Sequence, residues 1–251
     1  MHHSASARSL ALAALYAFLL LAVGATLNLI APYDPEPGRS LSLSAYLLWG
    51  ASYLPLAVLP AVWNWRIAEF GFVISPRMLV GSMFLLAICT PMTALKMPSF
   101  QASLAEAFAR TGEEIFFRGF LFLLAMSAFR KCKRPWLLAV LVTSVCFIAV
   151  HTQTFQSGYF SPEELSQAPH YALVLQRLLN LSLIATALGL LRHLTGSVLP
   201  GAIAHTALNA GIGAALGSLF IYAMVVVIAR GRGEAVAEGF HSHQSPTGGA
   251  A

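Results

Sequence analysis

The sequence predicts an all-α fold, namely a polytopic integral membrane helical bundle of about eight transmembrane helices. Of its 251 residues, 57% are hydrophobic and only 10% are charged, whereas about a quarter of the residues in a soluble domain carry a charge. Several apolar runs also reach about 17 to 22 residues, which is the length needed to cross a hydrocarbon core of ~30 Å. Composition and run length therefore both indicate a membrane protein.

The predicted spans follow one another along the chain, with bounds of about 9–31, 43–63, 77–95, 109–129, 135–151, 171–191, 197–213 and 215–230. The last two spans come from one apolar run that is too long for a single crossing, and glycines near residues 211–217 offer a place to turn. Before the fourth span, the stretch PSFQASLAEAFAR is predicted to form a short amphipathic helix at the interface.

All of these spans belong to one membrane domain, residues 1–232, which is followed by a polar tail at 233–251. Because the tail is rich in Gly, Ser and polar residues, we predict that it is disordered. The three cysteines show no CxxC spacing, so neither a disulfide framework nor a structural zinc site is expected.

The positive charges predict the orientation, because lysine and arginine concentrate in cytoplasmic loops. With the N-terminus inside, ten of them lie in inside loops and three in outside loops. The inside set is Arg8, Arg66, Arg77, Arg130, Lys131, Lys133, Arg134, Arg192, Arg230 and Arg232, and the outside set is Arg39, Lys96 and Arg110. Both termini are therefore predicted to be cytoplasmic, in the inner (plasma) membrane. The net charge of +5 is explained by these flanking residues, so no nucleic-acid partner is expected.

Ionisable residues on three spans are predicted to meet at one depth. Glu113 and Glu114 lie in the outer part of the fourth span, and His151 ends the fifth, which runs outward. The seventh span carries His205 and Asn209, which share a helix face because they are four residues apart. Ionisable groups that converge inside a membrane predict a functional site.

The chemistry of these groups suits attack by water on a peptide carbonyl. Glu114 and Arg118 can pair at i, i+4, whereas Glu113 is rotated by ~100° and can face another helix. A carboxylate beside a histidine can hold and deprotonate a water molecule. A histidine with an asparagine can donate hydrogen bonds to the developing oxyanion. The chain contains neither a GxSxG elbow nor an HExxH zinc motif.

Three motifs occur in order on these predicted spans: EEIFFR fits EExxxR, FIAVH fits FxxxH and HTALN fits HxxxN. Over about residues 77–225 the chain resembles the CPBP family of intramembrane glutamic proteases, which includes CAAX prenyl endopeptidases and Abi proteins. The resemblance implies that Glu113 is the general base and that His151 helps to hold the water. It also implies oxyanion stabilisation by His205 and Asn209 and support from the Glu114–Arg118 pair, without a cofactor.

Several alternatives stay open at this point. The charged residues could form only a structural ion-pair network, or the two glutamates and two histidines could ligate zinc, although Asn209 is a poor zinc ligand. The same cleft could instead serve an Abi-like immunity or scaffold protein that binds without cutting. A transporter is also conceivable, but no inverted repeat is visible in the sequence.

The expected substrate is a membrane-embedded or lipid-anchored protein that reaches the site from the bilayer. Because the charge bias puts the site on the outer side, it argues against prenylated CAAX proteins, which are processed on the cytoplasmic face. A protein with a C-terminal sorting helix fits this orientation better. Outside the site, we expect Phe147 to be a packing residue, Ser161 to cap the helix that begins SPEEL, and Arg177 to be paired or snorkelling.

Overall fold

A computed structural model describes residues 7–30, 50–55, 70–72, 100–151, 160–209 and 224. Within these ranges the regular structure is entirely helical, which confirms the predicted all-α class. The elements are α1 (Ala7–Ile30), α4 (Phe100–Glu114), the π-helix η2 (Ile115–Leu121), α5 (Phe122–Ala128), α6 (Pro135–Val150), α7 (Pro162–Gln167), α8 (His170–Thr195) and α9 (Leu199–Asn209).

One helix in the described part of the chain, α8, is both long and apolar enough to cross a membrane, and Ala14–Val23 and Pro135–Val150 are shorter apolar helices. The predicted spans 43–63, 77–95 and 215–230, like the tail at 233–251, lie mostly or wholly outside the described residues. The count of about eight spans therefore stays a prediction.

The fourth predicted span is longer than expected and has a different start. The stretch at 98–110 was predicted to be a separate interfacial helix, but from Phe100 onward it runs directly into the span, so that α4, η2 and α5 form one continuous helix. The reason is local: FQASLAEAFARTGEE consists largely of good helix formers, and its one glycine, Gly112, does not end the helix. The π-helical segment Ile115–Leu121 was not predicted at all.

Helices α6 and α8 pack closely on each other. Pro135 starts α6 at its first turn, where a missing amide hydrogen costs nothing. Gly189 of α8 allows the approach, because a Cβ atom there would lie 3.1 Å from Cγ1 of Val140. At its other end, α8 stops at Gly196, which adopts a left-handed conformation with φ of 70°.

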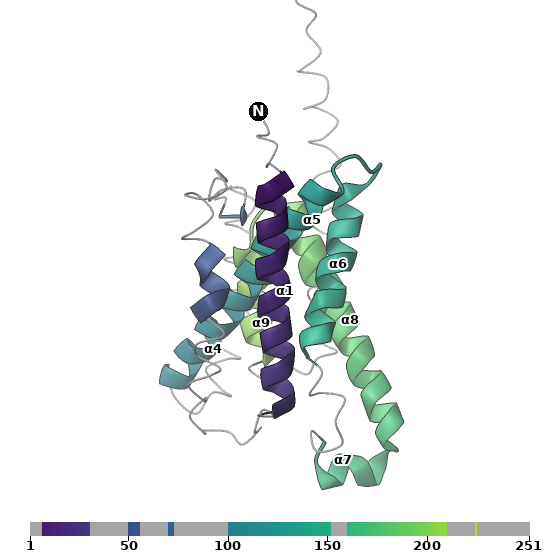
Figure 1. The fold of residues 1–251 in the computed structure, drawn as a ribbon. Helices are drawn as coiled ribbons and strands as arrows, with labels where there is room; N and C mark the ends of the chain where they lie inside the picture. Colours follow the sequence, from purple (N-terminus) through teal and green to yellow (C-terminus); the bar gives the residue numbers. More distant parts are fainter. Residues whose placement is uncertain are drawn as a thin grey trace, which may run out of the picture.

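The most basic loop and the acidic α7 segment lie at opposite ends of the described helices (Figure 1). In Figure 1 the first turn of α1 and the α5–α6 turn, which carries the basic RKCKR cluster, lie at one end of the bundle. Helix α7 lies at the opposite end, where α8 begins. Which of these ends faces the cytoplasm stays a prediction from the charge bias.

The short helix α7 begins with a capping box, which confirms the predicted role of Ser161. The Ser161 hydroxyl accepts a hydrogen bond from the Glu164 amide at 3.2 Å, and the Glu164 carboxylate accepts one from the Ser161 amide at 2.9 Å. Glu164 also pairs with Arg177 at 3.3 Å, so Arg177 is paired as predicted.

We expect Ser161→Ala to destabilise α7 by about 1 kcal/mol, because the Glu164 amide loses its partner. The hydrogen bond from the Ser161 backbone amide holds the pKa of Glu164 below its usual value. A lowered pKa stabilises the folded form at a pH above the ordinary carboxylate pKa. This stabilisation is lost as the pH falls through the lowered pKa of the folded form. The protection of the amides of residues 161–167, measured against an unstructured peptide at the same pH, should therefore be lower in the variant and, in the wild type, lower in acid. Equal exchange in both proteins would contradict the prediction.

Candidate active site

Five of the six predicted site residues, all except Asn209, meet where α4 packs against α9 and where η2 contacts α8. A small residue makes the α4–α9 contact possible: a Cβ atom on Gly201 of α9 would lie 2.9 Å from Oε2 of Glu114. The absence of a side chain at Gly201 thus lets the glutamate lie directly against the α9 backbone.

Glu114 is the buried centre of the site. Its Oε1 lies 3.1 Å from Nη1 of Arg118, which is the i, i+4 pair predicted from the sequence. The same oxygen lies 2.9 Å from Nδ1 of His205, and all three side chains are buried. Because an ionised carboxylate can only accept a hydrogen bond, Nδ1 of His205 carries a proton and donates a hydrogen bond to Oε1 of Glu114.

Arg118 is fixed on several sides. Its Nη2 donates to the carbonyl of Ala185 in α8 at 3.3 Å. Its guanidinium carbon also lies 4.4 Å from the ring centroid of Phe147, where a cation–π contact is favourable. The Phe147 ring touches His151 and His205 as well, at centroid distances of 4.4 and 5.6 Å. Phe147 is thus a packing residue between the charged groups, as expected.

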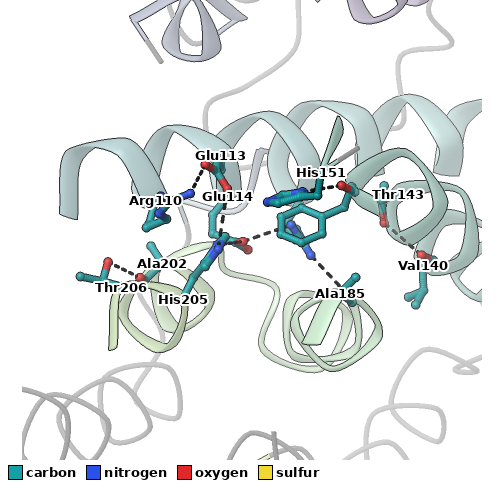
Figure 2. A network of polar contacts seen from close by, with 12 residues as sticks. Arg110, Glu113, Glu114, Val140, Thr143, His151, Ala185, Ala202, His205 and Thr206 are labelled. Atoms are coloured by element: carbon teal, nitrogen blue, oxygen red, sulfur yellow. Dashed lines mark hydrogen bonds and ion pairs between the residues drawn. The ribbon is translucent and has the colours of Figure 1, made fainter. Parts of the chain in front are cut away.

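Glu113 is held in a different way. Its Oε1 forms an ion pair with Arg110, one turn earlier on α4. Its Oε2 lies 3.7 Å from Nε2 of His205 and, among the described residues, makes no hydrogen bond although it is buried. Figure 2 shows His205 between the two carboxylates, with contacts to both.

Arg110 is a site residue that the sequence analysis missed, since it was assigned to an outside loop. The available signal was its i, i+3 spacing to Glu113, which is a favourable distance for an ion pair within a helix. Together, Arg110 and Arg118 supply two positive charges that balance the two carboxylates.

His151 ends α6 beside this cluster. Its Nδ1 lies 2.7 Å from the carbonyl oxygen of Phe147, which can only accept, so Nδ1 carries a proton and donates this hydrogen bond. Figure 2 shows its imidazole directed toward the carboxylate pair. Asn209 is the last residue of α9, four positions after His205. Its side chain lies outside what the structure describes.

The resulting arrangement can hold and deprotonate a small polar molecule. One oxygen of Glu113 is anchored by Arg110, and the other faces imidazole nitrogen in a buried setting. A buried acceptor without a protein partner is costly, so a water molecule that binds there gains a strong hydrogen bond. In the described part of the chain, no group of three or more His, Cys, Asp and Glu side chains is arranged to hold a metal ion.

Comparison with known proteins decides the family. The model of the type II CAAX prenyl endopeptidase Rce1-like family matches residues 78–211, which is more than half of the chain. The chain belongs to the Rce1-like family. The match includes all six predicted site residues and Arg110. Family membership makes the chain, in general terms, a membrane-embedded CAAX-type endopeptidase. No curated protein and no solved structure matches it.

A further prediction concerns the contact between α9 and Glu114. We expect Gly201→Ala to lower the free energy of unfolding by about 1–3 kcal/mol, because the added methyl group must displace the buried carboxylate from Arg118 and His205. Gly50→Ala is the matched control, since a Cβ atom there meets nothing within 4 Å. Thermal unfolding in detergent compares the two variants. Equal stability of both variants would contradict the assigned packing.

Proposed function

We propose that this member of the family is an intramembrane endopeptidase of the glutamic type, which hydrolyses a peptide bond with a water molecule activated by Glu113. One observation carries the proposal. Oε2 of Glu113 is buried without a hydrogen-bond partner among the described residues and faces Nε2 of His205, while Arg110 fixes Oε1. This geometry gives a water molecule one carboxylate oxygen to which it can lose a proton.

The reaction follows from these positions. Glu113 removes a proton from the water, and the oxygen attacks the carbonyl carbon of the scissile bond to form a tetrahedral oxyanion. Glu113 then delivers the proton to the leaving nitrogen, and the C–N bond breaks to give a new carboxylic acid and a new amine. In this scheme Glu113 serves first as base and then as acid, which one carboxylate can do within a closed site.

The other residues support this cycle. We assign His151 to the water, because the Phe147 carbonyl holds its imidazole at Nδ1 and the ring is directed toward the carboxylate pair (Figure 2). Glu114 orients His205 through Nδ1, so the imidazole edge that carries Nε2 faces the reacting atoms. His205 and Asn209 are proposed to stabilise the oxyanion, which requires His205 to be doubly protonated when the oxyanion forms.

Zinc is the competing cofactor, and one observation speaks against it. A zinc ion would need oxygens from Glu113 and Glu114, and each of these carboxylates already pairs through Oε1 with a guanidinium group, whose positive charge would repel the ion. Cationic partners at both carboxylates suit a carboxylate base better than a dication. We therefore propose a reaction without a metal. Activity that is lost to a chelator and restored by zinc would overturn this part of the proposal.

The proposed substrate is a membrane-embedded or lipid-anchored protein that is cut near the outer face, with both termini of the protease in the cytoplasm. This orientation predicts that the exposed Cys132 in the RKCKR loop reacts with an impermeant maleimide only after the cells are opened. Cys132→Ser identifies the labelled site. Labelling in intact cells would reverse the orientation and would favour a substrate processed in the cytoplasm, such as a prenylated CAAX protein.

The experiment that tests the function compares the membrane and secreted proteomes of cells that make the wild type or Glu113→Gln. An endopeptidase predicts that uncut precursors accumulate with the variant although it is inserted in normal amounts. If the proteomes are equal and the variant still supports the phenotype that the deletion lacks, the cleft binds a partner without cutting, as an immunity or scaffold protein would.

A further inference from the structure

The π-helix η2 changes the backbone hydrogen bonds directly after the catalytic cluster. In an α-helix the amide of Phe122 would donate to the carbonyl of Arg118, four residues earlier. Here it donates to the carbonyls of Phe117 and Gly119 instead. The carbonyl of Arg118 is thus released from the bond that α-helical geometry would give it. Such π-helical insertions are local, costly departures from an α-helix and occur often at functional sites.

A buried arginine on α8 binds this carbonyl. Nε of Arg192 donates to the carbonyl oxygen of Arg118 at 3.0 Å, and the Arg192 side chain is buried. Arg192 was counted in the sequence analysis as a charge in an inside loop, which is wrong, because it belongs to the last turn of α8. A charged donor that is taken out of water in this way needs a strong acceptor, and a backbone carbonyl inside the bundle provides one.

Helix α8 therefore binds Arg118 twice. Its Ala185 carbonyl accepts from the Arg118 guanidinium, and its Arg192 donates to the Arg118 backbone. Ala185 and Arg192 are seven residues apart, so both lie on one face of α8, two turns from each other. The same guanidinium pairs with Glu114, which in turn orients His205.

We propose that Arg192 is a positioning residue of the active site, which holds η2 in its π-helical register and thereby fixes the Glu114–Arg118 pair. The role rests on the proposed function, because Glu114, the partner of Arg118, is assigned there to orient His205. Without Arg192, the Arg118 carbonyl is returned to the Phe122 amide. The i, i+4 pair with Glu114 is compatible with either register, but the change of register rotates Arg118 relative to α8 and moves its guanidinium, together with Glu114, away from the Ala185 carbonyl.

The surroundings of Arg192 restrict its position. Its guanidinium carbon lies 5.5 Å from the ring centroid of Phe122, the residue directly after η2. On another side, a Cβ atom on Gly71 would lie 2.8 Å from Nε, so only glycine fits there. Gly71 also adopts a backbone φ of 100°, which residues other than glycine rarely adopt. The Gly71 carbonyl in turn accepts from the amide of Val198, one residue before α9. Gly71 thus contacts Arg192 of α8 and is bonded to the residue from which α9, the helix of His205, starts.

The test measures backbone protection and kinetics on the full protein in lipid nanodiscs. Hydrogen exchange is followed for residues 115–123, with residues 171–185 as an internal reference. The kinetic probe is a quenched fluorescent, farnesylated peptide that ends in a CAAX sequence, the substrate type for which the family is named. Nanodiscs expose both faces of the protein, so the orientation in the cell does not restrict this probe. The variants are Arg192→Met, which removes the donor, and Arg192→Lys, which keeps a donor and the charge. Arg177→Met is the matched control, because it removes a partly exposed arginine from the same helix.

We expect Arg192→Met to speed exchange in residues 115–123 by about tenfold or more, because a hydrogen bond to a charged group is lost. The kcat should fall by a similar factor at unchanged KM, because the catalytic groups and not the binding surface move. Arg192→Lys should recover most of both effects, and Arg177→Met should show neither.

Unchanged exchange at 115–123 in Arg192→Met would overturn the proposal, as would faster exchange there with unchanged kcat. If Arg192→Met fails to accumulate, Arg192→Gln replaces it, because glutamine keeps a donor without the charge. Protection retained in Arg192→Gln supports the hydrogen bond, and protection lost in it contradicts the hydrogen bond. Glu113→Gln is measured in parallel. If Glu113→Gln cleaves normally, the proposed function fails, and the exchange data still decide whether Arg192 holds the register.

Discussion

Arg118→Met is expected to lower the free energy of unfolding by about 3–5 kcal/mol, which is the usual cost of removing one partner of a buried ion pair. The variant leaves Glu114 buried with one hydrogen-bond donor, Nδ1 of His205, and without its charge partner. It also leaves the Ala185 carbonyl without the Arg118 donor. Methionine fills much of the space, so the loss reports the charge and the hydrogen bonds more than the volume.

Denaturant or thermal unfolding in detergent measures this effect against Arg177→Met, whose pair with Glu164 is partly exposed and is expected to contribute at most about 1 kcal/mol. A double variant, Arg118→Met with Glu114→Gln, removes the unpaired charge and should recover part of the loss. If Arg118→Met is as stable as the control, the pair does not hold the helices together.

The second large effect is kinetic. Glu113→Gln should lower kcat by about 10²–10⁴-fold, because glutamine keeps the shape but cannot accept the proton of the water. The KM should stay nearly constant, since the side chain is assigned to the reaction and not to substrate binding. Glu163→Gln on α7 is the matched control and should leave both constants unchanged.

One confounding effect has its own control. Glu113→Gln leaves Arg110 without the carboxylate that it pairs with, and a stray buried charge can by itself disturb a site. The double variant Arg110→Gln with Glu113→Gln removes that charge. The assigned role predicts that the double variant stays inactive. Recovered activity would mean that Glu113 serves to neutralise Arg110 and is not the base.

Much of the site could be predicted because it depends on local spacing and span order. The i, i+4 spacing of Glu114 and Arg118 already predicted their pair, and alternating span directions put His151 and His205 at the depth of the glutamates. These are properties of single helices and of their sequence order. They need no knowledge of how the helices pack.

The remaining features depend on tertiary contacts or on the exact end of a helix. Arg110 and Arg192 were both read as loop charges, because charge alone does not reveal that a helix begins earlier, as α4 does, or ends later, as α8 does. The π-helix has no residue signature here, since it differs from an α-helix in which backbone carbonyls accept from the Phe122 amide. The bond from His205 to Glu114 follows from the close approach of α9 at Gly201.

The most direct test of the central claim is peptide hydrolysis by purified, metal-depleted protein in proteoliposomes, with a substrate taken from the proteome comparison and water enriched in ¹⁸O. The account predicts that the wild type, after chelation, still cuts one bond and places ¹⁸O in the new carboxylate, whereas Glu113→Gln does not. Cleavage by Glu113→Gln at the wild-type rate, or wild-type activity that returns only with added zinc, would contradict a glutamate-activated water.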